Sequence, residues 1–231
     1  MASAFHSDAP IAGGTPLPTR SPVPASVRYV VFMPDIEIGE LRRDELPAAG
    51  ALLGRAYRDN PFMIAFLGDD PDHRLRGMEC IHGTRVSAMR PPALAARRDG
   101  ELVGVCGFDA PGGSEMPPED LQRMLLTLSG LGADVLTKMQ TVLAEFSKRA
   151  PAERHWHLGP VGVHIDVQGQ GIGSLMMDEF CARMDAAGDL AFLETDLPQN
   201  VRLYERFGFV TVEEAAVLGV PGWFMQRRPR T

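Results

Sequence analysis

A glycine-rich run at 168–173, QGQGIG, is the part of the sequence best suited to bind an anion. It lies between an apolar run, residues 158–165, and an amphipathic run, residues 172–184, which predicts a strand, a loop and a helix in that order. Glycine lets the backbone approach a ligand closely because no Cβ stands in the way. The first amides of the helix, with the positive end of its dipole, favour a negative charge. The pattern therefore predicts a diphosphate site.

A dinucleotide is the first alternative ligand for this loop. A dinucleotide fingerprint has the pattern G-x-G-x-x-G and an acidic residue about 20 positions further on. Gly169 and Gly171 fit that pattern and Glu194 could be the acidic residue, but Ser174 stands where the third glycine belongs. Too little chain follows to complete a doubly wound domain. The sequence therefore argues against a dinucleotide-binding domain.

A second motif follows a predicted strand at residues 190–195. Asn200 and Tyr204 are four residues apart on a predicted helix, so they share one face, and the helix ends at Phe207-Gly208-Phe209. Together with the glycine loop, this motif resembles the GNAT superfamily of acyl-CoA-dependent N-acetyltransferases. The resemblance covers roughly residue 36 to the C-terminus. Within the superfamily, the stretches 155–174 and 191–209 resemble the puromycin N-acetyltransferase-like group.

The resemblance implies an α/β (α+β) fold: a mixed, mostly antiparallel sheet with a splayed central strand pair and helices on both faces. It also implies acetyl-CoA as cosubstrate, with no metal. The backbone of Val161 and Val163 would pair with the pantetheine arm, Gln168 would order the loop, and Asn200 would lie near the pantetheine or the diphosphate. The residues whose backbone would hold the diphosphate are Gly169, Gln170, Gly171, Ile172, Gly173 and Ser174.

The resemblance also assigns catalytic roles. Tyr204 would be the general acid, because a phenol is protonated at neutral pH and can donate its proton to the leaving thiolate. The general base is open: His157 and Glu194 are the two candidates, and the third possibility is a different residue or no base at all. His157 lies on the strand before the splay, where an imidazole could accept a proton near neutral pH, and Glu194 lies at the end of the next strand.

Composition excludes several other classes of protein. A net charge of −7 and a pI near 5.4 argue against a nucleic-acid binder. Cys80, Cys106 and Cys181 have neither the spacing of a metal site nor that of a disulfide framework. No apolar run is long enough to span a bilayer, and a signal peptide is not evident. We therefore expect a cytoplasmic protein that binds neither nucleic acid nor membrane.

The N-terminal part of the chain predicts a tail and then a domain. Residues 1–34 are rich in Pro and Ala and predict a disordered tail, which leaves 35–231 as the acetyltransferase-like domain. Residues 36–41 alternate with period two and predict a strand, after which Asp44 is expected to cap a helix. Residues 62–67 form an apolar segment in a loop-like context, either core packing or the wall of an acceptor pocket.

The middle of the chain predicts a helix over about 72–89 and a hairpin around Asp99-Gly100. Helical spacing recurs within residues 111–151, an insert that could shape a substrate pocket or form a dimer face. Pro160 interrupts the strand before the glycine loop, which suits a strand that separates from its neighbour there. The last predicted elements are two antiparallel strands at 209–217 and 222–226.

The sequence thus predicts direct transfer of an acetyl group from acetyl-CoA to a primary amine of a small molecule, by a monomer or a homodimer. Two alternatives stay open: acetylation of a protein N-terminus or lysine, and a non-catalytic acyl-CoA-binding regulatory module. The second alternative would tend to lose Tyr204, so its presence argues for an enzyme.

Overall fold

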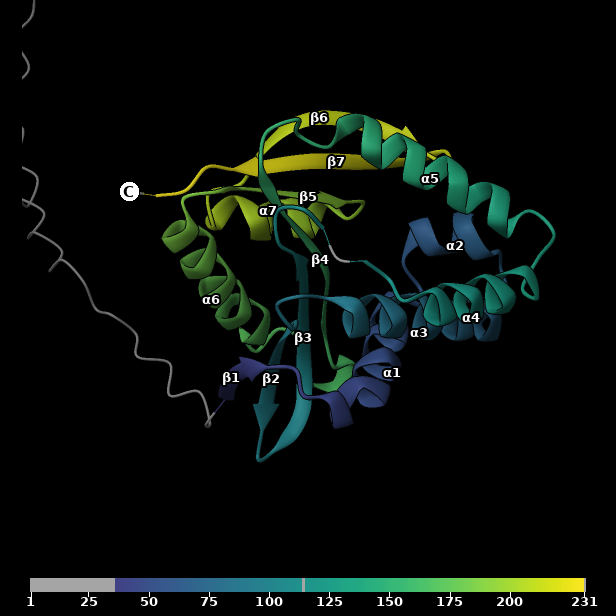
Figure 1. Cartoon of the computed structure of the whole chain (residues 1–231), viewed down its shortest axis with the longest axis horizontal. Helices are drawn as coiled ribbons and strands as arrows, with labels where there is room; N and C mark the ends of the chain where they lie inside the picture. Colours follow the sequence, from purple (N-terminus) through teal and green to yellow (C-terminus); the bar gives the residue numbers. More distant parts are fainter. Residues whose placement is uncertain (1–35, 114, 231) are drawn as a thin grey trace, which may run out of the picture. The chain divides into compact units, whose positions relative to one another are not determined.

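The computed structural model describes residues 36–113 and 115–230, so the predicted tail at 1–34 lies outside the described residues. The described chain forms a mixed α/β fold around a seven-stranded sheet with the order β1-β2-β3-β4-β5-β7-β6 (Figure 1). All neighbouring strands are antiparallel except β4 and β5. The strands are β1 Ile36–Glu40, β2 Leu94–Arg98, β3 Glu101–Asp109, β4 His155–Val163, β5 Leu190–Thr195, β6 Val210–Val217 and β7 Val220–Arg227.

Helices pack on both faces of this sheet, as predicted. On β4, Gly162 faces α1, because a Cβ there would lie 2.9 Å from Leu53 Cδ2. On β3, Gly104 faces α6, because a Cβ there would lie 2.9 Å from Met176 Cε. Gly162 pairs with Val105, and successive residues of a strand point to opposite faces, so α1 and α6 lie on opposite sides of the sheet. The helices are α1 Leu46–Tyr57, α2 Pro61–Leu67, α3 Pro71–Ala88, α4 Pro118–Ser129, α5 Val135–Arg149, α6 Ile172–Ala187 and α7 Pro198–Arg206.

The central strand pair is splayed. β4 and β5 pair only from His155–Leu190 to His157–Phe192, although β4 continues to Val163. Pro160 lies in the separated part of β4. Beyond this pairing, the edge of β4 that faces β5 is open to side chains and ligands.

Two elements differ from the sequence-based prediction. Asp44 does not cap a helix: it lies in a 3-10 turn, η1 Arg43–Glu45, and α1 begins only at Leu46. The apolar segment 62–67 is not a loop but belongs to the helix α2, whose first turn is capped by the Asn60 side chain accepting from the Phe62 amide at 2.8 Å. A helix of seven residues is too short for its periodicity to be recognised.

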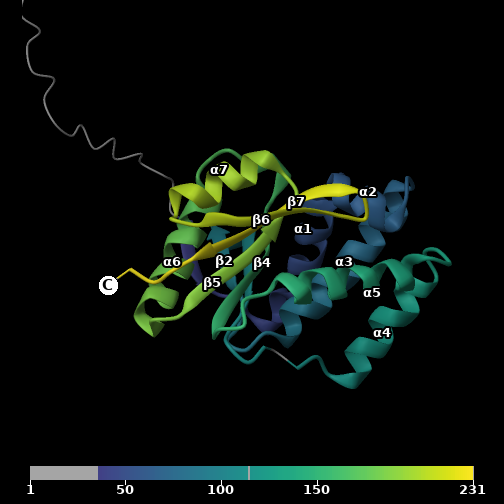
Figure 2. The ribbon, with the colours of Figure 1, turned by 90° about the horizontal axis from the view of Figure 1, so that it is seen from above.

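The remaining predicted elements are confirmed with small shifts at their ends. The hairpin turns at Asp99 and Gly100, both with positive φ, and Gly208 ends α7 with φ of 89°. The 111–151 insert forms α4 and α5, which pack on α3 and on the α2–β6 region (Figure 2). The insert therefore lies against α2, α3 and β6.

Candidate active site

The glycine loop connects β4 to α6 through a short 3-10 turn, η2 Ile165–Val167. Gly169 and Gly171 have φ of 76° and 84°, a conformation that residues with a side chain rarely adopt. Gly171 is followed directly by the first turn of α6, whose leading amides have no partner within the helix. The Gln168 side chain donates from Nε2 to the carbonyl of Val163 at 3.1 Å and so fixes the loop against β4.

A groove runs from this loop along the separated edge of β4 to α7. Asn200 and Tyr204 of α7 both line it, as their spacing predicts. Gln170 is an exception among the predicted cofactor-binding residues: it does not line the groove, and its side chain accepts from Arg98 Nη2 at 2.8 Å. The other predicted residues, Val161, Val163, Gln168, Gly169, Gly171, Ile172, Gly173 and Ser174, line the groove.

Tyr204 is 8% exposed and its ring packs 5.9 Å from that of Phe209. Burial raises the pKa of its phenol above the ordinary value, so the hydroxyl is protonated throughout the physiological range. Tyr204 therefore reaches the groove as a proton donor.

A second tyrosine, Tyr57 at the end of α1, lies where the groove meets another pocket, and it lines both. Its hydroxyl accepts a hydrogen bond from the Val161 amide and donates one to the Val161 carbonyl, each at 3.1 Å. Burial raises its pKa to about 12. Nothing in the sequence near Tyr57 distinguishes it from an apolar helix position, so sequence reasoning missed this contact.

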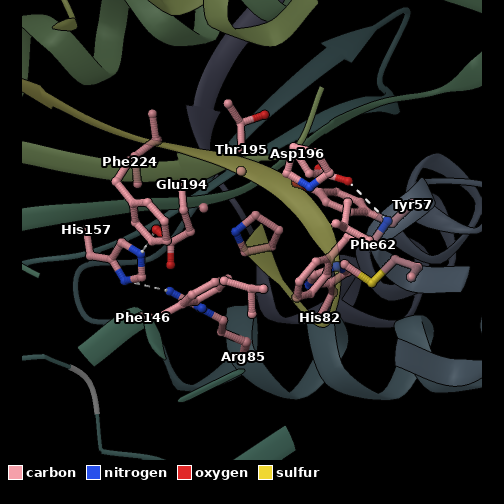
Figure 3. A pocket seen from close by; sticks show the side chains of 18 residues that line it. Tyr57, Phe62, His82, Arg85, Phe146, His157, Glu194, Thr195, Asp196 and Phe224 are labelled. Carbon is pink, nitrogen blue, oxygen red and sulfur yellow. Dashed lines mark hydrogen bonds and ion pairs between the residues drawn. The ribbon is translucent and has the colours of Figure 1, made fainter. Parts of the chain in front are cut away.

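The adjoining pocket, here called the aromatic pocket, lies between the end of β5, β7, α2, α3 and α5 (Figure 3). Phe62 and Met63 of the predicted apolar segment line it, whereas Phe66 and Leu67 are buried in the core. Core packing is therefore confirmed for Phe66 and Leu67, whereas Phe62 and Met63 line a pocket, and its use by an acceptor stays a prediction. The polar side chains in the wall are those of Tyr57, His82, Arg85, His157, Glu194, Thr195 and Asp196.

The two candidate bases are hydrogen-bonded to each other. His157 Nε2 lies 2.7 Å from Glu194 Oε2, and His157 Nδ1 lies 3.2 Å from Arg85 Nη2 (Figure 3). Arg85 Nη2 also pairs with Asp109 Oδ2 at 3.0 Å. A guanidinium can only donate, so His157 Nδ1 is the acceptor and Nε2 carries the proton given to Glu194. The imidazole is thus neutral with both nitrogens engaged, and Glu194 is the partner that accepts.

The family model described as "Acetyltransferase (GNAT) family" matches residues 59–209, which span α2 to α7 and include both motifs. The chain belongs to the acetyltransferase (GNAT) family.

Solved GNAT structures share this fold. A "histone acetyltransferase HPA2 and related acetyltransferase" from Corynebacterium glutamicum has 22% identity, covers 85% of this chain and 97% of its own, and has a TM-score of 0.64. An agmatine N-acetyltransferase variant without ligand has 14% identity, covers 84% and 99%, and has a TM-score of 0.55. A GNAT family acetyltransferase from Brucella melitensis, in complex with acetyl-CoA, has 19% identity, covers 86% and 91%, and has a TM-score of 0.50. At these identities the likeness concerns the fold.

This GNAT domain contains further polar residues that sequence reasoning missed. Asp196, two positions after Glu194, accepts from Asn60 Nδ2 at 2.9 Å and from the Phe62 amide at 3.2 Å, which fastens α2 to the end of β5. Arg85 of α3 holds His157 from the opposite side. The spacing of Asp196 from Glu194 is a signal that could have been used, whereas Arg85 had none.

The described part of this GNAT chain gives two further findings. Over residues 36–113 and 115–230, no three His, Cys, Asp or Glu side chains are grouped so that they could hold a metal ion. Within the same residues, no helix has the length and apolar character needed to cross a membrane.

Proposed function

We propose that this GNAT family member transfers an acetyl group from acetyl-CoA to a primary amine of a small molecule by direct attack on the thioester. The observation that carries the proposal is that two cavities meet at Tyr57: a groove with a helix N-terminus for the diphosphate, and a pocket with a carboxylate for the amine. A thioester at the junction would be within reach of both.

The groove supplies the contacts that acetyl-CoA needs. The leading amides of α6 and the loop at Gly169 and Gly171 would hold the diphosphate. The Val161 amide would then bind the thioester carbonyl, where such a donor lowers an acyl-transfer barrier by about 3 kcal/mol. The Brucella melitensis structure, which shares the fold and contains acetyl-CoA, supports this assignment of the cosubstrate.

Glu194 is the better base of the two candidates, because a neutral His157 bonded through both nitrogens has no lone pair left to take a proton. His157 then positions the carboxylate. In the step, the amine nitrogen attacks the thioester carbon, and the C–S bond breaks as the tetrahedral intermediate collapses. The surplus proton on nitrogen passes to Glu194, and the leaving thiolate takes a proton from Tyr204.

A small acceptor suits the shape of the aromatic pocket. Phe146 of α5, from the insert, and Phe224 of β7 both line the pocket, and further lining residues come from α1, α2, α3, β4, β5 and β6, so the pocket is walled on many sides. The resemblance of residues 155–174 and 191–209 to the puromycin N-acetyltransferase-like group points the same way. The structural neighbour named as an agmatine N-acetyltransferase shows that this fold is used with a small amine.

Calorimetric titration with acetyl-CoA tests the first half of the proposal, and release of free thiol with a panel of amines tests the second. We expect saturable acetyl-CoA binding, and a fall in kcat of about 100-fold in Tyr204→Phe, the size typical of losing a general acid. Absence of acetyl-CoA binding by the intact chain would contradict the proposal. An unchanged kcat in Tyr204→Phe would remove Tyr204 as the acid.

A further inference from the structure

A second histidine in the aromatic pocket, His82, has no hydrogen-bond partner among the described residues. His82 of α3 is 8% exposed and lines the pocket, and neither of its ring nitrogens is hydrogen-bonded to any residue that the structure describes. It differs in this from His157, whose two nitrogens are both engaged. A buried polar group without a hydrogen-bond partner destabilises the fold. When such a group lies in the wall of a pocket, a bound ligand is the group that can supply the missing hydrogen bond.

His82 is a neutral group in this position. Burial, with a smaller effect from the charge on Arg85, lowers its pKa to about 3. A neutral imidazole offers one N–H donor and one nitrogen acceptor. These match a hydroxyl or a carbonyl group on a ligand, whereas an ammonium group would need a base to take its proton. The ring is held in place by Tyr57, whose ring centroid lies 4.5 Å away.

The apolar part of the pocket is built from flat rings. Phe62 and Phe146 lie nearly parallel with centroids 6.1 Å apart, and Phe146 meets Phe224 edge-on at 5.9 Å. All three rings line the pocket (Figure 3). Aromatic walls in these offset and edge-on arrangements favour another flat ring over a flexible chain.

The charges in the pocket select an ammonium group. Glu194 and Asp196 both present carboxylates to the pocket, and the positive charge of Arg85 is already paired with Asp109 at 3.0 Å. An acceptor with a carboxylate of its own would be repelled by these two carboxylates. An amine whose other polar group is neutral would not be repelled.

We propose that the acceptor is a primary amine on an aromatic body that carries a hydroxyl or carbonyl group, and that His82 binds this neutral group. The inference rests on the proposed acetyl transfer and adds the substrate class. It makes His82 a specificity-determining residue of the acceptor pocket.

The test compares kcat/KM for four amines with acetyl-CoA as donor: butylamine, 2-phenylethylamine, and two hydroxylated forms of the latter, tyramine and 2-amino-1-phenylethanol. We expect the aromatic amines to exceed butylamine, and at least one hydroxylated amine to exceed 2-phenylethylamine by about tenfold. His82→Phe should bring that second ratio close to one. His82→Gln, which keeps a donor and an acceptor, should restore part of it.

His73→Phe is the matched control, because His73 lies on the same helix outside the pocket, beside Asp70 at 3.4 Å. In His73→Phe, the ratio of kcat/KM for the hydroxylated amine to that for 2-phenylethylamine should equal the ratio in the unmodified chain. Calorimetry with acetyl-CoA shows whether each variant is folded, and if His82→Phe is not, His82→Leu takes its place: a hydroxyl preference that survives His82→Leu counts against the role of His82.

The outcomes separate this inference from the proposed function. Equal use of butylamine and the aromatic amines, or a hydroxyl preference that survives His82→Phe, would overturn the inference while acetyl transfer stands. Failure to bind acetyl-CoA would overturn both.

Discussion

The Tyr57 hydroxyl bonds to both backbone groups of Val161, accepting from its amide and donating to its carbonyl, each at 3.1 Å. These are the groups on the open edge of β4 that the resemblance assigns to the pantetheine arm. The same two groups cannot bind the phenol and an acyl chain together, so in the proposed function acetyl-CoA would have to displace the Tyr57 hydroxyl in order to pair with Val161. The Tyr57 side chain thus satisfies the backbone groups of Val161 on the open edge of β4.

Tyr57→Phe should therefore tighten acetyl-CoA binding. Without the competing hydroxyl, acetyl-CoA would not have to replace a hydrogen bond to Val161. The binding free energy should then be more favourable by about 1 kcal/mol, which lowers Kd roughly fivefold. The same change should lower the free energy of unfolding by about 1 kcal/mol, because the Val161 groups lose their partner. Calorimetry and urea denaturation measure the two effects. Weaker acetyl-CoA binding by a well-folded variant would mean that the hydroxyl contacts the cosubstrate instead.

Glu194→Gln should reduce kcat by about 100-fold, since an amide cannot accept the proton of the amine. His157→Asn should cost less, about tenfold, because it removes a positioning contact and leaves the carboxylate. Steady-state kinetics with one amine acceptor measures both losses. The reverse order, with the larger loss of kcat in His157→Asn, would make the histidine the base.

Gly171→Ala should weaken acetyl-CoA binding. A residue with a Cβ at φ of 84° costs about 1 kcal/mol, and relief of that strain would turn the first amides of α6 away from the groove. We expect a Kd about tenfold higher, by calorimetry. Gly188→Ala is the matched control: Gly188 ends the same helix with φ of 72° and lies far from the loop in sequence. It should lose similar stability and keep the acetyl-CoA affinity; equal affinity losses in both variants would contradict the role of Gly171.

Burial of neutral His82 should make the fold sensitive to mild acid. Its pKa is lowered to about 3, so below its ordinary value near 6.5 the unfolded chain binds a proton that the folded chain does not. The contribution of His82 to the free energy of unfolding is therefore fully present above about pH 6.5 and is lost as the pH falls towards 3. About 2 kcal/mol of it is lost by pH 5.

Urea denaturation at pH 7 and pH 5 measures this loss, and His82→Gln should lack it. The window avoids Glu45, whose pKa is lowered to about 2 by Arg97 and whose stabilisation is lost only at lower pH, as it falls below about 4.5. The same loss in both proteins between pH 7 and pH 5 would show that His82 is not the cause.

The sequence alone determined the features that depend on neighbours along the chain. The glycine loop before α6, the shared face of Asn200 and Tyr204, and the Asp99-Gly100 turn are all recognisable because backbone conformation and helical spacing act over a few residues. The same local signals, with the family resemblance, led to the mixed sheet with its splayed strands. The helix α2 was not predicted, because seven residues are too few to show a helical periodicity.

Only the tertiary structure decided how the site is completed. Tyr57 and Val161 are 104 residues apart, and His157 and Glu194 are 37 apart, so no local pattern brings either pair together. Strand register pairs His157 with Phe192 and so brings Glu194, two residues further on, within reach of the imidazole. The packing of α1 on the sheet and of α3 on α1 delivers Tyr57, His82 and Arg85 to the same cavity. Contacts of this kind depend on how distant surfaces fit, which is a property of the packed core and not of any segment taken by itself.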